Sequence, residues 1–249
     1  MLVETEAIVL KVRKFSDTSK IAVLFSKEFG KISVLAKGAF SVKSKFGGGL
    51  EVLSYINISF YKKASSDLHL LKSLELITLF NKTLKNYNAL ITSFISSEML
   101  SFTQADNCAN YKLFSSYIEY AKNLNIRVDY AFVYGIIFMF RLADNLGLSI
   151  NFNIPDFVYA MNDNDLSAGI KISLQDGSFV ATSRDKFIFY TFNLHTIQKI
   201  MDLNFISYDV VSEILIGVNE YIEVVNFFSR YFSYHLGCKI SLQSIDLLV

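Results

Sequence analysis

The spacing of apolar residues changes near Thr78 of this chain of 249 residues, and the change restricts the folds open to it. Before Thr78, apolar and polar residues alternate in several short segments. A period of two is typical of half-buried β-strands. After Thr78, apolar residues recur at every third or fourth position, which is typical of helices with one buried face. We therefore predict an α+β protein whose strands precede its helices.

The segments with a period of two predict five strands, at about 8–12, 21–25, 32–36, 51–61 and 68–77. The last two are joined by the polar residues 62–67, which suit a turn. Five short strands without a long helix between them can bury one face only by closing into a barrel or packing on a second layer. We predict a five-stranded OB-fold β-barrel over residues 1–80, followed by a mainly α-helical domain over residues 81–249.

Helical spacing predicts helices at about 84–99, 111–121, 130–146, 194–203 and 207–236. Gly147 follows the third and can cap it, and Gly237 can stop the last. Pro155, the only proline, marks a break, and residues 156–192 lose helical regularity. Within them, Asp176 and Gly177 separate two short apolar segments. This arrangement predicts a β-hairpin of residues 170–173 and 178–181.

Positive charge is concentrated near the N-terminus. Residues 11–45 contain nine Lys/Arg against only Asp17 and Glu28, in a chain whose formal net charge is +1. Such an excess attracts polyanions, so we predict a nucleic-acid surface on which the cations form one continuous exterior stripe. A lysine-rich strand surface can also be only a solvated face or a protected sheet edge.

Other features exclude several classes of protein. The longest uncharged apolar run, Tyr130–Phe140, is shorter than the ~18 residues that a membrane span needs. The N-terminus is acidic and does not read as a signal peptide, and two cysteines 130 residues apart suggest no disulfide framework. We therefore expect a soluble cytoplasmic protein. Residues 38–44 resemble a P-loop but have no glycine before Lys43, so nucleotide binding is not expected.

A series of short motifs gives a more specific indication. They are residues 6–10 (EAIVL), 16–20 (SDTSK), 25–31 (FSKEFGK), 37–39 (KGA) and 43–48 (KSKFGG), with weaker echoes in residues 140–147 and 234–240. In order and spacing the series resembles the N-terminal domain of the RecO family of bacterial DNA repair proteins. The weaker echoes extend the resemblance over most of the chain.

The resemblance implies an OB-fold followed by a helical domain, in a recombination mediator that is not an enzyme and that acts in the bacterial cytoplasm, associated with the nucleoid. Proteins of this family bind single- and double-stranded DNA and anneal complementary strands. They associate with RecR and with the C-terminal tail of single-strand-binding protein, and they help RecA to replace that protein on DNA. A salt-dependent DNA-binding surface agrees with this role.

Individual residues follow from the resemblance and from charge. Matching positions predict nucleic-acid contacts at Lys37, Gly38, Lys43, Lys45, Gly47 and Gly48. Charge and strand position alone add Lys11, Arg13, Lys14 and Lys20. For the acidic tail of single-strand-binding protein, charge alone suggests Arg127, Arg141, Arg184 and Lys199.

The sequence also departs from the family. Many members have Arg where Phe40 stands, so either a cation has been lost or an aromatic stacking surface gained. Many carry a four-cysteine zinc module in the region that corresponds to residues 149–192. Residues 149–183 contain no cysteine and no histidine here, so we expect a zinc-less insertion and no cofactor. As an alternative function, the helical half binds an acidic or apolar peptide and the basic barrel is incidental.

Overall fold

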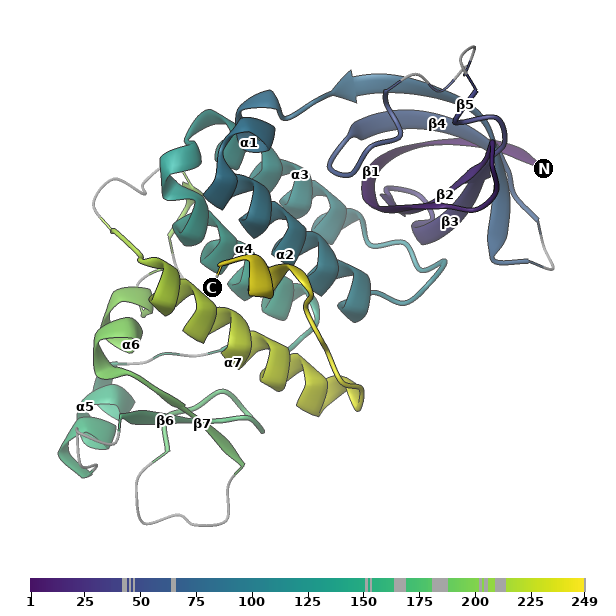
Figure 1. The fold of residues 1–249 in the computed structure, drawn as a ribbon. Helices are drawn as coiled ribbons and strands as arrows, with labels where there is room; N and C mark the ends of the chain where they lie inside the picture. The colour runs from purple at the N-terminus through teal and green to yellow at the C-terminus, as the bar shows by residue number, and fades with distance from the viewer. Residues whose placement is uncertain are drawn as a thin grey trace. The chain divides into compact units, whose positions relative to one another are not determined.

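The computed structural model describes residues 1–41, 44, 46, 48–63, 66–150, 152, 154–163, 169–180, 188–201, 203, 206–208 and 214–248 (Figure 1). Its contacts form two compact units, and each is described by itself. The barrel unit comprises Met1–Lys85 with Leu100–Ile118, and the helical unit comprises Asn86–Met99 with Glu119–Val249. Because these units interleave along the chain, the division between residues 80 and 81 stays a prediction.

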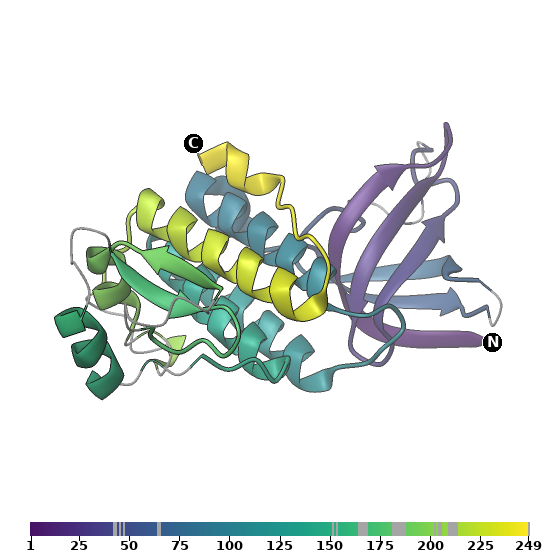
Figure 2. The same cartoon turned by 90° about the horizontal axis from the view of Figure 1, so that it is seen from below.

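Five strands close into a barrel in the order β1-β2-β3-β5-β4. They are β1 (Leu2–Lys14), β2 (Lys20–Ser26), β3 (Gly30–Ala36), β4 (Tyr55–Tyr61) and β5 (Leu68–Thr78). All neighbours pair antiparallel except β3 and β5, which are parallel. The strands wrap around a common interior in both views (Figures 1 and 2). The predicted OB-fold barrel is confirmed, although β4 begins at Tyr55 and not at residue 51.

A β-bulge in β1 decides which side chains of this strand face the barrel interior. The register with β2 shifts between Val9 and Lys11, so that Leu10 is an extra residue. Val9 and Val12 consequently both pack in the barrel core, although they are three positions apart. Lys11, which would share the face of Val9 in a regular strand, is exposed instead.

Residues 100–118 complete the barrel unit. The Asn107 amide donates to the Lys31 carbonyl at 2.8 Å, and the Lys31 ammonium donates to the Ser101 carbonyl at 2.7 Å. Gly30 has a φ of +66°, and a Cβ atom on it would lie 1.9 Å from the backbone oxygen of Cys108. Only glycine fits this position, because both the conformation and the close approach exclude a side chain.

The chain after the barrel is mainly helical, as predicted. Its helices are α1 (Asn81–Lys85), α2 (Tyr87–Thr103), α3 (Tyr111–Ile126), α4 (Ala131–Asn145), α5 (Ile154–Asp163), α6 (Leu194–Ile200) and α7 (Val218–Leu236), with short 3-10 turns at Val128–Tyr130 and Ser244–Leu248. Gly147, with a φ of +72°, follows α4 as predicted. Helix α4 contacts α7 next to Gly135, where a Cβ atom would lie 2.9 Å from the Tyr221 ring. No helix among the described residues is long and apolar enough to cross a bilayer.

Three predictions in this part are wrong in detail. Residues 154–163 form α5 although they follow the predicted break, because Pro155 lies in the first helical turn, where an amide has no partner to lose. The last helix starts at Val218, eleven residues late, where the Gly217 amide bonds the Glu220 carboxylate. The first predicted helix, 84–99, is divided between α1 and α2.

The predicted β-hairpin is present in part, with amide bonds from Ser173 to Ser178 and from Val180 to Lys171, and its first strand also pairs with a later segment. Strand β6 (Ile170–Ser173) pairs antiparallel with β7 (Phe189–Phe192), and residues 178–180 contribute only a single bridge, between Ile172 and Phe179. Ala181, the predicted end of the partner segment, is outside the described residues. The later strand, which was not predicted, is anchored by Phe192, which is fully buried against Phe227 of α7.

Candidate nucleic-acid interface

The C-terminal half of β1 presents two cations on the outer face of the barrel. Lys11 and Arg13 follow the bulge with Val12 between them, and both are exposed whereas Val12 packs towards the core. In the described part of the chain, neither forms an ion pair. Both charges are therefore available to an anion in solution.

Lys14 and Lys20 lie at the open end of the barrel. They are paired with each other across β1 and β2, and the register gives them the same side as Val12 and Ala22. Lys14 forms an exposed pair with Asp17 at 3.1 Å, which is easily exchanged for another anion. Lys20 is more restrained, because its ammonium donates to Glu51 at 2.8 Å and its side chain is only 15% exposed.

The loop after β3 approaches the same end. Ala36 is the register partner of Lys20, and the next residue, Lys37, is exposed. Gly38 has a φ of +76° and its carbonyl accepts from the amide and the hydroxyl of Ser41, at 3.1 and 2.8 Å. This tight turn requires the backbone freedom of glycine. Gly48 is exposed, and a Cβ atom there would meet nothing within 4 Å.

Phe40 lies within this turn and connects the loop to the β1–β2 turn. Its amide donates to the Thr18 carbonyl at 3.1 Å, and the Lys20 ammonium lies 4.9 Å from its ring centre. We call the set of Lys14, Phe15, Lys20, Lys37, Phe40 and Glu51 the rim. Sequence reasoning missed Phe15 and Glu51, since nothing near them in the sequence relates them to the basic residues.

The predicted cations therefore do not form one continuous stripe. Strand register divides the described ones between the outer face, with Lys11 and Arg13, and the rim, with Lys14, Lys20 and Lys37. They nevertheless gather where β1 ends, β2 begins and β3 ends. Lys43, Lys45 and Gly47 are outside the described residues, so their predicted roles stay predictions.

Of the four cations predicted to bind a peptide, the three that the structure describes are not brought together. The Arg127 guanidinium lies 4.2 Å from the Tyr130 ring centre. Arg141 stacks on Tyr208 at 4.8 Å and lies 3.9 Å from Glu119, and Lys199 donates to Glu220 at 2.6 Å. Arg184 is outside the described residues. The three described cations are thus engaged within the helical unit, on separate elements.

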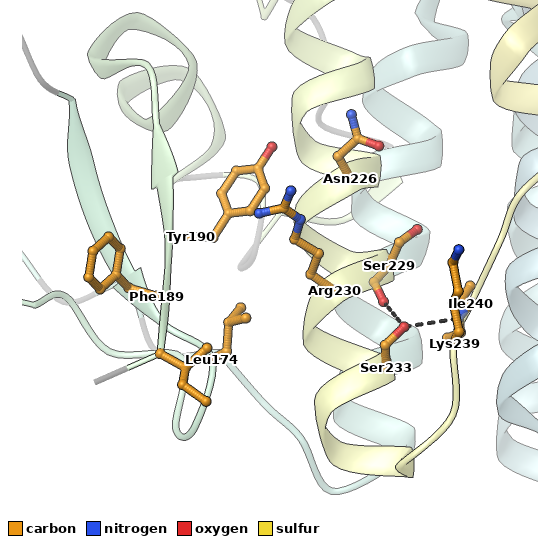
Figure 3. Close-up of a pocket in the computed structure, with 10 residues that line it drawn as sticks. Leu174, Phe189, Tyr190, Asn226, Ser229, Arg230, Ser233, Lys239 and Ile240 are labelled. Atoms are coloured by element: carbon orange, nitrogen blue, oxygen red, sulfur yellow. Dashed lines mark hydrogen bonds between the residues drawn. The ribbon is translucent and has the colours of Figure 1, made fainter. Parts of the chain in front are cut away.

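A cleft of about 690 Å³ lies between the hairpin and α7 (Figure 3). It combines cations with apolar side chains, as was expected of the predicted peptide site. Its described lining contains two exposed cations, Arg230 and Lys239, and no carboxylate; the other residues are Leu174, Ile188, Phe189, Tyr190, Asn226, Ser229, Ser233 and Ile240. The Arg230 guanidinium lies 5.4 Å from the Tyr190 ring centre. Burial, with the nearby Glu223 carboxylate, raises the pKa of Tyr190 to about 12, so its phenol stays neutral.

Ser233 shapes one end of this cleft. Its hydroxyl donates to the Ser229 carbonyl at 2.6 Å and accepts from the Ile240 amide at 3.0 Å, as the dashed lines in Figure 3 show. These bonds hold the segment after α7, and with it Lys239, beside the helix. Arg230 and Lys239 were not among the predicted peptide-binding residues, although Lys239 lies in the RecO-like echo at residues 234–240, because the residues that surround them come from distant parts of the chain.

The insertion does not fit a zinc ion. Residues 149–183 offer no thiol or imidazole, and the described residues contain no group of three His, Cys, Asp or Glu side chains that could hold a metal. Aromatic contacts occupy this part of the helical unit: Phe179 lies 5.5 Å from Phe152 and 5.4 Å from Phe157, centre to centre. That the chain needs no cofactor stays a prediction.

Comparison with known proteins agrees with the barrel. Residues 1–80 match the family model described as recombination protein O N terminal. The first 80 residues are thus similar to the N-terminal domain of the RecO family. Similar proteins include three named DNA repair protein RecO: one from Prosthecochloris aestuarii, 44% identical over 70 residues, one from Mycoplasma mycoides, 32% identical over 148 residues, and one from Mycoplasma capricolum, 29% identical over 153 residues.

These matches cover only part of each protein. They span 28%, 59% and 61% of this chain, and 26%, 59% and 61% of the respective RecO relatives, which is less than two thirds of each. The resemblance to RecO predicted from the short motifs is confirmed. The family model ends at residue 80, and the longer pairwise matches extend the similarity beyond it.

Proposed function

We propose that this chain acts in DNA repair and recombination by binding DNA through the rim and the outer cations of its barrel. The observation that carries the proposal is the gathering of Lys11, Arg13, Lys14 and Lys37 around one end of a RecO-type barrel. Each is exposed, and three have no ion-pair partner in the described part of the chain. Phosphate contacts of this kind position a nucleic acid without reading its sequence.

A strand-annealing mediator follows from this chemistry. Cations that neutralise phosphates lower the repulsion between two strands, and base pairing then supplies the specificity. No bond is made or broken in such a role, so we do not propose an enzyme. By relation to RecO we further propose that the chain works with RecR and single-strand-binding protein, and that it helps RecA onto DNA that single-strand-binding protein covers.

A salt titration tests the DNA-binding site. Lys11→Ala, Arg13→Ala and Lys37→Ala should each reduce the slope of log affinity against log salt by roughly 0.7 on a single strand and roughly 0.9 on a duplex. Lys72→Ala on β5 is the matched control, because it removes the same charge from an exposed strand position outside the site. If the three variants keep the slope of the unaltered protein, these cations do not contact phosphate.

An annealing assay tests the activity. Complementary oligonucleotides are mixed with the protein, with and without single-strand-binding protein, and duplex formation is followed over time. The mediator hypothesis is supported if the unaltered protein accelerates annealing and the triple Ala variant of Lys11, Arg13 and Lys37 does not. DNA binding without any effect on annealing would leave a DNA-binding module and reject the strand-annealing step.

The cleft beside α7 supports a second function, the binding of an acidic peptide with an apolar end. Arg230 and Lys239 provide charge, and Leu174, Ile188 and Ile240 provide an apolar surface. A peptide with the sequence of the tail of single-strand-binding protein should bind the unaltered protein, and Arg230→Ala with Lys239→Ala should weaken it at least tenfold. Arg127→Ala, which removes a cation outside the cleft, is the control. Equal affinity in all variants would reject this site.

A further inference from the structure

An exposed aromatic ring occupies the rim among the cations. Phe40 keeps 48% of its surface exposed, and Phe15, on the turn to which the Phe40 backbone is bonded, keeps 58%. A lone exposed Phe needs no explanation on a protein surface. Two of them on adjoining turns at the cationic end of an OB-type barrel provide apolar surface where a polyanion is proposed to lie.

The Phe40 ring is also held in place. Its amide is fixed to the Thr18 carbonyl at 3.1 Å, and the turn that contains it is closed by the Ser41 bonds to Gly38. The Lys20 ammonium lies 4.9 Å from the ring centre, and Glu51 holds that ammonium at 2.8 Å. Without DNA, the Lys20 ammonium therefore already interacts with the Phe40 ring and with the Glu51 carboxylate. A ring fixed before binding loses little conformational freedom when a ligand stacks on it.

We infer that Phe40 is a stacking surface for an unpaired base, and that it makes the rim selective for single-stranded DNA. The inference rests on the proposed DNA binding. Every base offers an aromatic face, so stacking tolerates any sequence, and neighbouring exposed cations such as Lys37 can hold the backbone. In a duplex the faces of the bases are already covered by their neighbours. Stacking on Phe40 is thus open to a single strand and closed to a duplex.

Substitution of Phe40 separates stacking from charge. Phe40→Leu keeps an apolar side chain without an aromatic face, and it should weaken binding of an oligothymidine by roughly five-fold or more, which corresponds to about 1 kcal/mol. Because no charge changes, the slope with salt should stay that of the unaltered protein. Duplex affinity should change less than two-fold. Phe40→Tyr, which restores an aromatic ring, should bind the oligothymidine as the unaltered protein does.

Fluorescence gives a direct readout, because the chain contains no tryptophan. Phe40→Trp introduces a single reporter, whose emission should be quenched when oligothymidine is added and should respond much less to duplex. Tyr61→Trp is the matched control: Tyr61 is 43% exposed and pairs with Leu2, at the opposite end of β1 from Lys14. Emission of the control should stay nearly constant.

The outcomes distinguish this inference from the proposed function. If the unaltered protein binds no DNA at low salt, the proposed function fails and the inference fails with it. If it binds DNA but Phe40→Leu binds single strands unchanged, or weakens single strands and duplex equally, the cationic site stands and the stacking role is rejected. Thermal unfolding of each variant shows whether the barrel is intact. Should Phe40→Leu not fold, an unquenched Phe40→Trp reporter in a folded protein that binds oligothymidine rejects the inference by itself.

Discussion

Glu51 should limit the affinity of the rim for DNA. Its carboxylate accepts from the Lys20 ammonium at 2.8 Å, so one of the five described rim and outer-face cations is neutralised within the protein. Glu51→Gln removes the negative charge, keeps the size of the side chain and releases Lys20 for a phosphate. Because Glu51 is 61% exposed, the ion pair contributes at most about 1 kcal/mol to stability, and the barrel should stay folded.

The expected gain follows from counterion release. One additional phosphate contact on a single strand steepens the slope of log affinity against log salt by roughly 0.7. At 0.1 M salt the Glu51→Gln variant should therefore bind about five-fold more tightly than the unaltered protein. Near 1 M salt the two proteins should bind equally. The assay is fluorescence anisotropy of a labelled oligothymidine at four or more salt concentrations.

Two controls make this prediction specific. Lys20→Ala in the Glu51→Gln background should remove the gain, since no ammonium is then left to meet the phosphate. Asp17→Asn frees Lys14 from a pair in which both side chains are already exposed, so its effect should be smaller than that of Glu51→Gln. Equal slopes for Glu51→Gln and the unaltered protein would show that Lys20 does not reach DNA even when free.

Three further predictions concern stability. Gly30→Ala should destabilise the protein by about 2–5 kcal/mol in urea unfolding, because it combines a positive φ with a clash against Cys108; Gly147→Ala, which also has a positive φ but open space around it, should cost only about 1–2 kcal/mol. Burial lowers the pKa of His69, so the contribution of the neutral imidazole to stability is complete above about pH 6.5 and declines as the pH falls towards the lowered pKa. His69→Phe should flatten that part of a profile of thermal stability against pH. Burial opposes ionisation of Glu220, but hydrogen bonds from a lysine and a backbone amide outweigh it and lower its pKa, so stability should fall as the pH drops below about 4.5, and Glu220→Gln should remove this dependence.

The barrel could be predicted from the sequence because its strands are local patterns. Alternation at Ile32, Val34 and Ala36 correctly indicates the side of β3 that faces the barrel core. In β2 the alternation is less informative, because Ala22 and Leu24 lie in the core while Val23 is only half-buried. The bulge in β1 has no such signature. It reverses the alternation after Leu10, and only the register with β2 reveals it.

The helical unit was harder to predict where tertiary contacts decide. Strand β7 joins β6 as a second partner, and its Phe192 packs on α7, a contact that no local turn signal could indicate. Pro155 was interpreted as a break, although a proline in the first turn is compatible with a helix that starts there. The cleft with Arg230 and Lys239 is assembled from segments that are separated by up to 66 residues, 174 to 240, so charge in the sequence could not identify it.

The charge count explains why composition is only a partial guide to the DNA site. Residues 11–45 have an excess of seven positive charges in the sequence. Three of these cations bond to carboxylates from outside the segment: Lys27 to Glu6 at 3.7 Å, Lys31 to Asp106 at 3.3 Å and Lys20 to Glu51 at 2.8 Å. Among the residues that the structure describes, folding therefore neutralises three charges of this excess.

These three ion pairs differ in whether a DNA phosphate could replace the carboxylate. Lys31 is 17% exposed and also bonds the Ser101 carbonyl, so its charge serves the packing of residues 100–118 and stays unavailable. Lys27 is half-buried, and its pair at 3.7 Å is the loosest of the three. Lys20 lies at the rim itself, where one exposed carboxylate separates it from a phosphate. Among these three cations, Lys20 is consequently the one whose release should change DNA affinity, and its present role is to hold the Phe40 ring.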